Sequence, residues 1–247
     1  MVFGLFSKER ALERTVKKAT NKLAQSQERW AALEKLRDIG TDEALYHLLR
    51  RFSFASLKGV EDEQEKAWVV QVMVGLGERS LGPLRRYMKS STAAIAYPLR
   101  ILEDVASREQ ALALIDEILA DEPPGYTKDT SKRIQIIDWL AEWRNGTDDD
   151  MVARVVPYLA DFDENVRFAT VEALSLRCTE AAAEPLIDAL LNEEEESGRF
   201  KARIVEVLHD QNLPLGERKK QIGKVLPDID DEFRLQRDKI VRKKKPK

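Results

Sequence analysis

Residue types that carry enzyme chemistry are scarce in this sequence. Its 247 residues include only 2 histidines, His47 and His209, and 1 cysteine, Cys178. A lone cysteine excludes an internal disulfide, and two distant histidines have no metal-ligand spacing. The phosphate-binding and nucleophile motifs GxxxxGK, GxGxxG and GxSxG are absent, as is the metalloprotease motif HExxH. We therefore predict no catalytic, cofactor-binding or metal site, and interpret Cys178 as a packed thiol.

Acidic runs and one aromatic group are the remaining candidates for chemistry. The acidic runs lie at 148–150, 193–196 and 228–232. None has the alternating ligands and central glycine of an EF-hand loop, and the first lies where a helix is expected to begin, a favourable place for carboxylates. Trp139 and Trp143 stand four residues apart, which fits one core stripe of a helix. We interpret both features as structural.

Positive charge is concentrated at the two ends of the chain. Residues 1–25 hold six basic and two acidic residues, and residues 234–247 hold eight basic and one acidic. Because the whole chain has a net charge of -3, residues 26–233 carry -14. Phosphate contacts need clustered Lys and Arg, so this acidic body argues against a nucleic-acid partner.

The elements that must position any site are helices. Apolar residues recur at helical spacing almost throughout, as in Trp30, Leu33 and Leu36, and strand signals are nearly absent. With 43% hydrophobic residues the chain can bury a core. No run approaches the roughly 18 consecutive apolar residues of a membrane span, and no signal-peptide core follows the first residue. We expect a cytoplasmic protein.

Breaks in the periodicity divide the chain into helical hairpins. The first break, at residues 40–42, combines a helix-stopping glycine with residues that cap a following helix. Further breaks lie near residues 77, 106, 146, 178 and 212, at intervals of 29 to 40 residues. Such a period is typical of a solenoid, in which each pair buries its apolar face by stacking on its neighbours. The expected pairs are 26–53, 61–89, 91–120, 129–160, 163–192 and 198–227.

Two segments carry a family resemblance. Residues 163–174, DENVRFATVEAL, resemble the first helix of a HEAT repeat of the short bacterial type also found in phycobilin lyases. Residues 183–191, AEPLIDALL, resemble its second helix, including the proline that opens it, and residues 75–84 repeat the pattern in part. The resemblance implies an all-α fold, an armadillo-like α-solenoid of about six HEAT-like hairpins wound into a right-handed superhelix.

The two ends lie outside the repeats. Leu5, Leu12, Val16, Ala19 and Leu23 define an amphipathic helix in residues 1–25, with basic residues on its polar sides. We interpret it as a cap on the first repeat, which solenoids require. The alternative is peripheral membrane contact, with Phe3, Leu5 and Phe6 inserted. We expect residues 228–247 to form a charged helix or tail.

Two connections are longer or richer in turn residues than the others. Residues 54–64 carry Gly59 and an acidic trio, and residues 121–127 form a Pro-Gly loop with Tyr126 exposed. Insertions in solenoids lie on one edge, where partners often bind. Tolerated loop variation is the other interpretation.

The second helices of the pairs give the functional hypothesis, since one helix of each pair is expected to line the concave side. Removing their apolar stripe leaves a face that is basic, then acidic, then basic: Tyr46, His47, Arg50, Arg51, Arg85, Arg86, Asp116, Glu117, Arg154, Asp188, Lys219, Lys220 and Lys224. Aromatic and Arg side chains dominate binding hot spots. We therefore predict a partner-binding site, with Tyr87 as a further anchor, in the following residues: Tyr46, His47, Arg50, Arg51, Arg85, Arg86, Tyr87 and Arg154.

These observations favour a non-enzymatic protein-protein interaction module, acting as scaffold, adaptor or regulatory protein. Three alternatives stay open. Alkylpurine DNA glycosylases use a HEAT-like solenoid of similar length, with Trp, Asp and Arg on a concave face, and the set Asp138, Trp139, Trp143 and Arg144 is comparable in type. A phycobilin-lyase-type role and membrane recruitment through residues 1–25 are the others. The sequence leaves the partner and the oligomeric state open.

Overall fold

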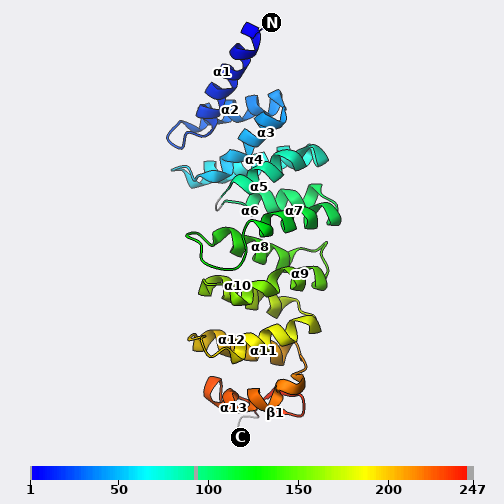
Figure 1. Ribbon diagram of the computed structural model, residues 1–247. Coiled ribbons are helices and arrows are strands. Elements are labelled where there is room, and N and C mark those ends of the chain that lie inside the picture. Colours follow the sequence, from blue (N-terminus) through cyan, green and yellow to red (C-terminus); the bar gives the residue numbers. More distant parts are fainter. Residues whose placement is uncertain (1, 92–93, 244–247) are drawn as a thin grey trace. The chain divides into compact units, whose positions relative to one another are not determined.

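The computed structural model describes residues 2–91 and 94–243, with side chains from residue 9 onward (Figure 1). Within these residues the chain forms thirteen α-helices, five short 3-10 helices and one two-stranded hairpin. The prediction of an all-α fold is confirmed. The chain divides into two compact units, residues 1–121 and residues 122–247.

Unit 1 consists of α1 and three helix pairs. Its elements are α1 (Val2–Ala19), α2 (Ser26–Ile39), α3 (Asp42–Leu49), η1 (Arg50–Ser53), α4 (Gly59–Gly75), η2 (Gly77–Ser80), α5 (Leu81–Ser90), α6 (Ala96–Val105) and α7 (Arg108–Ala120). The first helices pack in the order α2, α4, α6, and the second helices in the order α3, α5, α7. This is the stacking of a solenoid, in which each pair contacts the next.

Unit 2 also contains three helix pairs. Its elements are α8 (Ser131–Glu142), α9 (Asp148–Val155), η3 (Val156–Ala160), α10 (Glu164–Leu176), η4 (Glu180–Ala182), α11 (Ala183–Leu191), α12 (Gly198–Asp210), η5 (Gly216–Arg218), α13 (Lys219–Ile229), β1 (Phe233–Gln236) and β2 (Lys239–Arg242). The first helices pack as α8, α10, α12, and α11 packs against α13. Leu174, Leu186 and Leu190, which lie in the two segments that resemble a HEAT repeat, are buried.

Local signals place the helix boundaries. Gly40 has a φ of 60° and its N–H donates to the Leu36 carbonyl, which ends α2. Thr41 then caps α3 by accepting a hydrogen bond from the Ala44 N–H. At the start of α9, Thr147 and Asp150 form a capping box, so the acidic run at 148–150 has the structural role that the sequence indicates.

The first helix packs on the first pair. α1 contacts α2 and α3, and Val16 and Ala19 are buried there. This is the packing that a capping helix requires, and the capping role itself stays a prediction. Leu23 does not belong to the helical stripe, because α1 ends at Ala19 and the Leu23 side chain is exposed. Side chains of residues 1–8, including Phe3, Leu5 and Phe6, lie outside the described set.

The C-terminal segment differs from the expected helix or tail. α13 ends at Ile229, and β1 and β2 form an antiparallel hairpin with Phe233 opposite Arg242. Arg237 sits in the two-residue turn with a φ of 57°. Phe233 and Ile240 are buried on one side of the hairpin, which packs on α12 and α13. Alternation over only four residues per strand is too short a pattern to indicate strands by itself. Residues 244–247 lie outside the described set.

One glycine is required by close packing alone, which gives a first prediction. A Cβ added at Gly146 would lie 2.5 Å from Cε3 of Trp143, whose ring is buried. We expect Gly146→Ala to lower the free energy of unfolding by about 1–3 kcal/mol, because the ring cannot move away. Urea unfolding followed by circular dichroism measures this. Gly198→Ala is the control, since its Cβ meets nothing within 4 Å. Equal stability of the two variants would contradict the prediction.

Candidate protein-docking face

The predicted docking residues on α3 and α5 form one surface of unit 1, which we call the docking face. These two helices pack side by side, and Arg85 and Arg86 are exposed on α5. Tyr46, His47 and Arg50 are half-buried on α3 and at the start of η1. The structure therefore brings five of the eight predicted residues together.

Arg86 lies at the centre of the docking face. Its guanidinium forms an ion pair with Glu43 and stacks over the Tyr46 ring, 3.9 Å from the ring centroid. The Tyr46 hydroxyl lies 3.4 Å from the Ser90 hydroxyl on α5. The hydrogen bond from Arg86 holds the pKa of Glu43 below its usual range. An arginine held flat on an aromatic ring is preorganised for contact with a partner.

The other cations on α5 are paired with the next repeat. Arg85 Nε lies 2.7 Å from a Glu117 carboxylate oxygen on α7, and Lys89 Nζ lies 2.7 Å from the other. Lys89 also lies 3.2 Å from Asp121. The change of sign predicted along the second helices therefore exists, but neighbouring helices neutralise one another. The docking face therefore contains several ion pairs and carries little net positive charge.

His47 lies on this face with its pKa lowered from the ordinary value of 6.5, which favours the uncharged form at neutral pH. Burial lowers its pKa, although Nε2 lies 3.0 Å from Glu43, which opposes the shift. The ring nitrogen Nδ1 lies 3.5 Å from Arg50 Nη1 and favours the neutral form as an acceptor. His47 therefore orients its neighbours and adds no charge.

Three predicted docking residues are not on this surface. Arg51 is fully buried, and Tyr87 is buried with its hydroxyl donating to the Ala94 carbonyl. Neither side chain is available to a partner, so their assignment as docking residues is corrected. Arg154 belongs to unit 2, where its side chain is 17% exposed and donates to the Asp150 carbonyl.

Arg51 belongs instead to a buried ionic cluster between the first two pairs. Its Nε donates to Glu65 at 2.6 Å and its Nη2 to Asp62 at 2.6 Å. Arg29 from α2 forms three hydrogen bonds with the same Glu65 carboxylate. Lys66 Nζ lies 2.5 Å from Asp62. We call these five residues the buried cluster. Arg29 and Arg51 come from the first pair, whereas Asp62, Glu65 and Lys66 lie on α4 of the second.

Asp62 makes the stability of this cluster pH-dependent. Burial alone raises the pKa of Asp62, but hydrogen bonds from Lys66, the Ser56 amide and Arg51 outweigh it and hold the pKa well below the ordinary 3.8. The folded state therefore gains stability from the charged carboxylate above that value and loses it as pH falls below.

We expect Asp62→Asn to lower the free energy of unfolding by about 2–3 kcal/mol at pH 7, through loss of a buried charge partner. The difference from wild type should shrink when pH falls below 3.8 toward the pKa of the folded state. Urea unfolding of both proteins across this range measures it. A difference that is constant with pH would contradict the assignment.

Residues 126–208 match the family model of HEAT repeats. Residues 126–208 are HEAT repeats. The match spans about a third of the chain, from the loop before α8 to α12, and confirms the resemblance for this stretch. No curated protein matches the chain, and no solved structure matches it.

Ion pairs link the successive HEAT repeats. Arg177 Nε lies 2.7 Å from Asp148, and Arg203 Nε lies 2.7 Å from Glu172. Arg167 Nε lies 2.9 Å from Glu195, 28 residues further along the chain. The first two pairs join one repeat to the next, as Arg85 and Glu117 do in unit 1, and the third joins α10 to the connection before α12. Much of the charge on these helices is therefore used between repeats.

The tryptophans and the cysteine that were candidates for chemistry lie in positions with a structural role. Trp139 and Trp143 are buried in the HEAT repeats and stack with ring centroids 4.7 Å apart. Burial raises the pKa of the Cys178 thiol to about 11, so it is protonated at neutral pH. In the part of the chain that the structure describes, no group of His, Cys, Asp and Glu is arranged to hold a metal ion. None of the helices described there is both long and apolar enough to cross a lipid bilayer.

Proposed function

We propose that this HEAT-repeat protein is a non-enzymatic interaction module that binds a partner protein on the docking face. The observation that carries the proposal is the Glu43–Arg86–Tyr46 arrangement, an exposed arginine fixed on an aromatic ring between two repeats. Arginine and tyrosine held in this way are typical of binding hot spots. Scaffold, adaptor and regulatory roles, and a cytoplasmic location, belong to the same proposal.

Charge and burial favour a protein partner over the alternatives. Arg85, Arg86 and Lys89 already have carboxylate partners, which leaves Arg50 as the one docking-face arginine without an ion pair among the described residues, whereas phosphate contacts need clustered unpaired Lys and Arg. The aromatic residues that resemble a glycosylase site, Trp139 and Trp143, are buried and offer no surface for a flipped base. Because the ion pairs are internal to the face, we expect partner binding to depend weakly on salt.

Quantitative affinity purification from the native cell tests the proposal. The full-length chain is compared with an Arg50→Glu, Arg85→Glu, Arg86→Glu variant, after circular dichroism shows that both are folded. A Lys219→Glu, Lys220→Glu, Lys224→Glu variant on α13 provides an equal charge change elsewhere. We expect one partner to bind wild type and the control but to be reduced at least tenfold, about 1.4 kcal/mol, in the first variant. An identical captured set for all three would overturn the proposal.

A further inference from the structure

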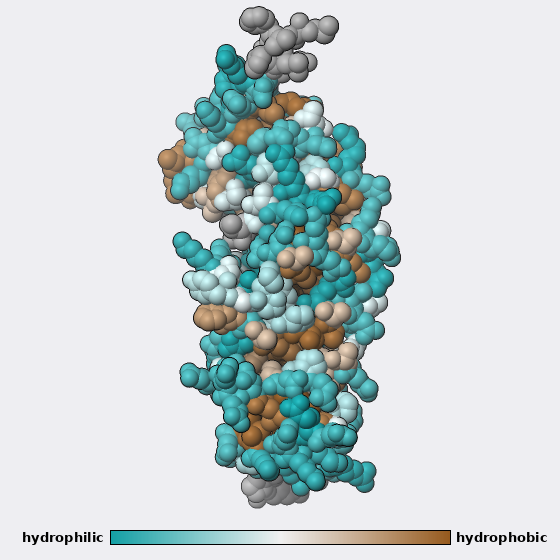
Figure 2. All heavy atoms as spheres, in the orientation of Figure 1, coloured by the Kyte–Doolittle hydropathy of each residue, from teal (hydrophilic) through white to brown (hydrophobic). Residues whose placement is uncertain are grey.

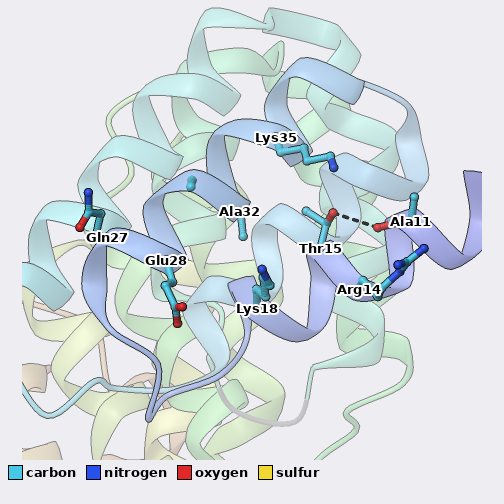
Figure 3. A pocket seen from close by; sticks show the side chains of 9 residues that line it. Ala11, Arg14, Thr15, Lys18, Gln27, Glu28, Ala32 and Lys35 are labelled. Atoms are coloured by element: carbon cyan, nitrogen blue, oxygen red, sulfur yellow. Dashed lines mark hydrogen bonds between the residues drawn. The ribbon is translucent and has the colours of Figure 1, made fainter.

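A groove lies between α1 and α2, on a different part of unit 1 from the docking face. It encloses a cavity of about 620 Å³. Figure 3 shows the lining side chains on the two helices, with Arg14 and Lys18 on α1 and Lys35 on α2. The volume is large enough for several side chains of an inserted segment.

The cations at this groove have no acidic partner among the described residues. Arg14, Lys18 and Lys35 form no ion pair with any residue that the structure describes, and Arg14 Nε donates only to the Arg10 carbonyl. Glu28 is the one acidic residue among those that line the cavity. The groove therefore has unneutralised positive charge, whereas Arg85 and Arg86 of the docking face are paired with carboxylates.

The floor of the groove is made of short side chains. Ala11, Ala31 and Ala32 line it, and the Thr15 hydroxyl is satisfied by the Ala11 carbonyl (Figure 3). Because the Thr15 hydroxyl already has this hydrogen-bond partner, the floor presents mainly methyl groups and needs no polar group from a partner. A partner backbone can approach such a floor closely while its acidic side chains reach the cationic rim.

A second cavity adjoins the first and has two leucines in an otherwise mostly polar lining. It measures about 520 Å³, shares Gln27 with the groove, and is lined by the loops at 20–25 and 54–58. Leu23 and Leu57, one from each loop, line it with 73% and 88% of their surfaces exposed. Figure 2 shows that most of the visible face is hydrophilic, and the two leucines add exposed apolar surface beside the cationic groove.

The buried cluster holds both loops of this second cavity. Arg29 donates to the Ala24 carbonyl of the first loop. Arg51 donates to the Phe54 carbonyl at 3.0 Å, and Asp62 accepts from the Ser56 amide at 2.6 Å, both in the second loop. The two leucines are thus presented by fixed backbone. Fixing a binding surface in advance lowers the entropy loss on association.

We propose that the groove and its adjoining cavity bind an acidic amphipathic segment of a partner protein. Its carboxylates pair with Arg14, Lys18 and Lys35, and one apolar side chain enters between Leu23 and Leu57. Charge complementarity selects the acidic partner. A flat lipid surface cannot reach the short side chains of the floor, which favours a protein segment. This surface is separate from the docking face, so the inference goes beyond the proposed function.

Selection of displayed random peptides of about 16 residues, roughly four helical turns, on the full-length chain tests the inference. We expect enriched peptides to combine Asp or Glu with Leu, Ile or Phe, and to lose at least tenfold in affinity for an Arg14→Glu, Lys18→Glu, Lys35→Glu variant. Affinity should also fall as salt rises. Basic or uncharged enriched peptides, or none sensitive to the variant, would overturn the inference.

Matched variants separate this site from the others. Leu23→Ser with Leu57→Ser should weaken the same peptides at least tenfold and leave the melting temperature unchanged, because both side chains are exposed. The Arg50→Glu, Arg85→Glu, Arg86→Glu variant and the α13 lysine variant should bind them normally. Sedimentation with phosphatidylcholine vesicles containing about a quarter phosphatidylserine is the lipid arm. Vesicle binding that the groove variant abolishes, without peptide enrichment, would overturn the inference in favour of a membrane.

Discussion

Replacing Glu65 by glutamine is expected to lower the free energy of unfolding by about 3–5 kcal/mol. Glu65 is fully buried, and its carboxylate accepts hydrogen bonds from Ser26, Arg29 and Arg51. Glutamine has nearly the same volume, so the change removes the charge and one acceptor with little effect on packing. Urea unfolding at neutral pH, followed by circular dichroism, measures the loss.

The size of this effect follows from the charge balance of the buried cluster. Three cations, Arg29, Arg51 and Lys66, face two carboxylates, Asp62 and Glu65. Glu65→Gln leaves Arg29 without its carboxylate partner in a site from which water is excluded. An uncompensated buried charge is among the most destabilising changes in a protein interior.

Glu63→Gln on the same helix is the matched control. The Glu63 side chain is 66% exposed and lies 3.8 Å from Lys66. Exposed ion pairs contribute about 0–1 kcal/mol, so this variant should unfold close to wild type. If Glu65→Gln also stayed within about 1 kcal/mol of wild type, the cluster would not hold the first two pairs together.

Helix positions were predictable because their signals are local. Gly40 and Thr41 stop one helix and cap the next within two residues, and apolar spacing of three and four defines each buried stripe. Tyr87 follows the same rule, since it stands three residues after Leu84 and beside Met88, both buried. The pattern therefore predicts a core position for Tyr87. The prediction of Tyr87 as a surface anchor was wrong because it did not use that spacing.

Buried charges were not predictable in the same way. Arg51 stands three residues after Leu48 and beside Phe52, at the spacing of the buried stripe, but its partners Asp62 and Glu65 come 11 and 14 residues later, beyond a loop. Glu117 is 32 residues from Arg85. The local pattern therefore does not identify the partners of these charges, because the partners are set by how repeats stack. The neutralised docking face and the cationic groove both follow from that stacking.

Unit 2 contains another buried ion pair, which stabilises the Pro-Gly loop. Arg133 Nη1 lies 2.8 Å from an Asp161 carboxylate oxygen and donates to the Gly125 carbonyl at 2.6 Å. The same carboxylate accepts from the Gly125 amide. Beside it, the exposed rings of Tyr126 and Phe162 meet edge to face, 5.5 Å apart. The Pro-Gly loop that the sequence singles out is therefore held in one conformation by a buried charge pair.

Asp161→Asn is expected to lower the free energy of unfolding by about 3–5 kcal/mol and to loosen this loop. Every group that faces the carboxylate is a donor: the Arg133 guanidinium and the amides of Gly125 and Asp163. The NH₂ of an asparagine must point at one of these donors, and Arg133 stays charged with only the more distant Glu122 carboxylate, 3.9 Å from its Nε, as a partner. Urea unfolding measures the stability, and amide hydrogen exchange over residues 122–130 measures the loop.

Asp163→Asn makes the same chemical change two residues away and serves as the control. Asp163 caps α10 by accepting from the amides of Asn165 and Val166, and asparagine is as good an N-cap as aspartate. This variant should therefore keep wild-type stability and exchange. The two substitutions differ only in the burial and charge of the groups that contact the carboxylate. Faster exchange in both variants would therefore show that the loop responds to general loosening of α10. Faster exchange in Asp161→Asn alone would show that the Arg133 ion pair fixes Tyr126.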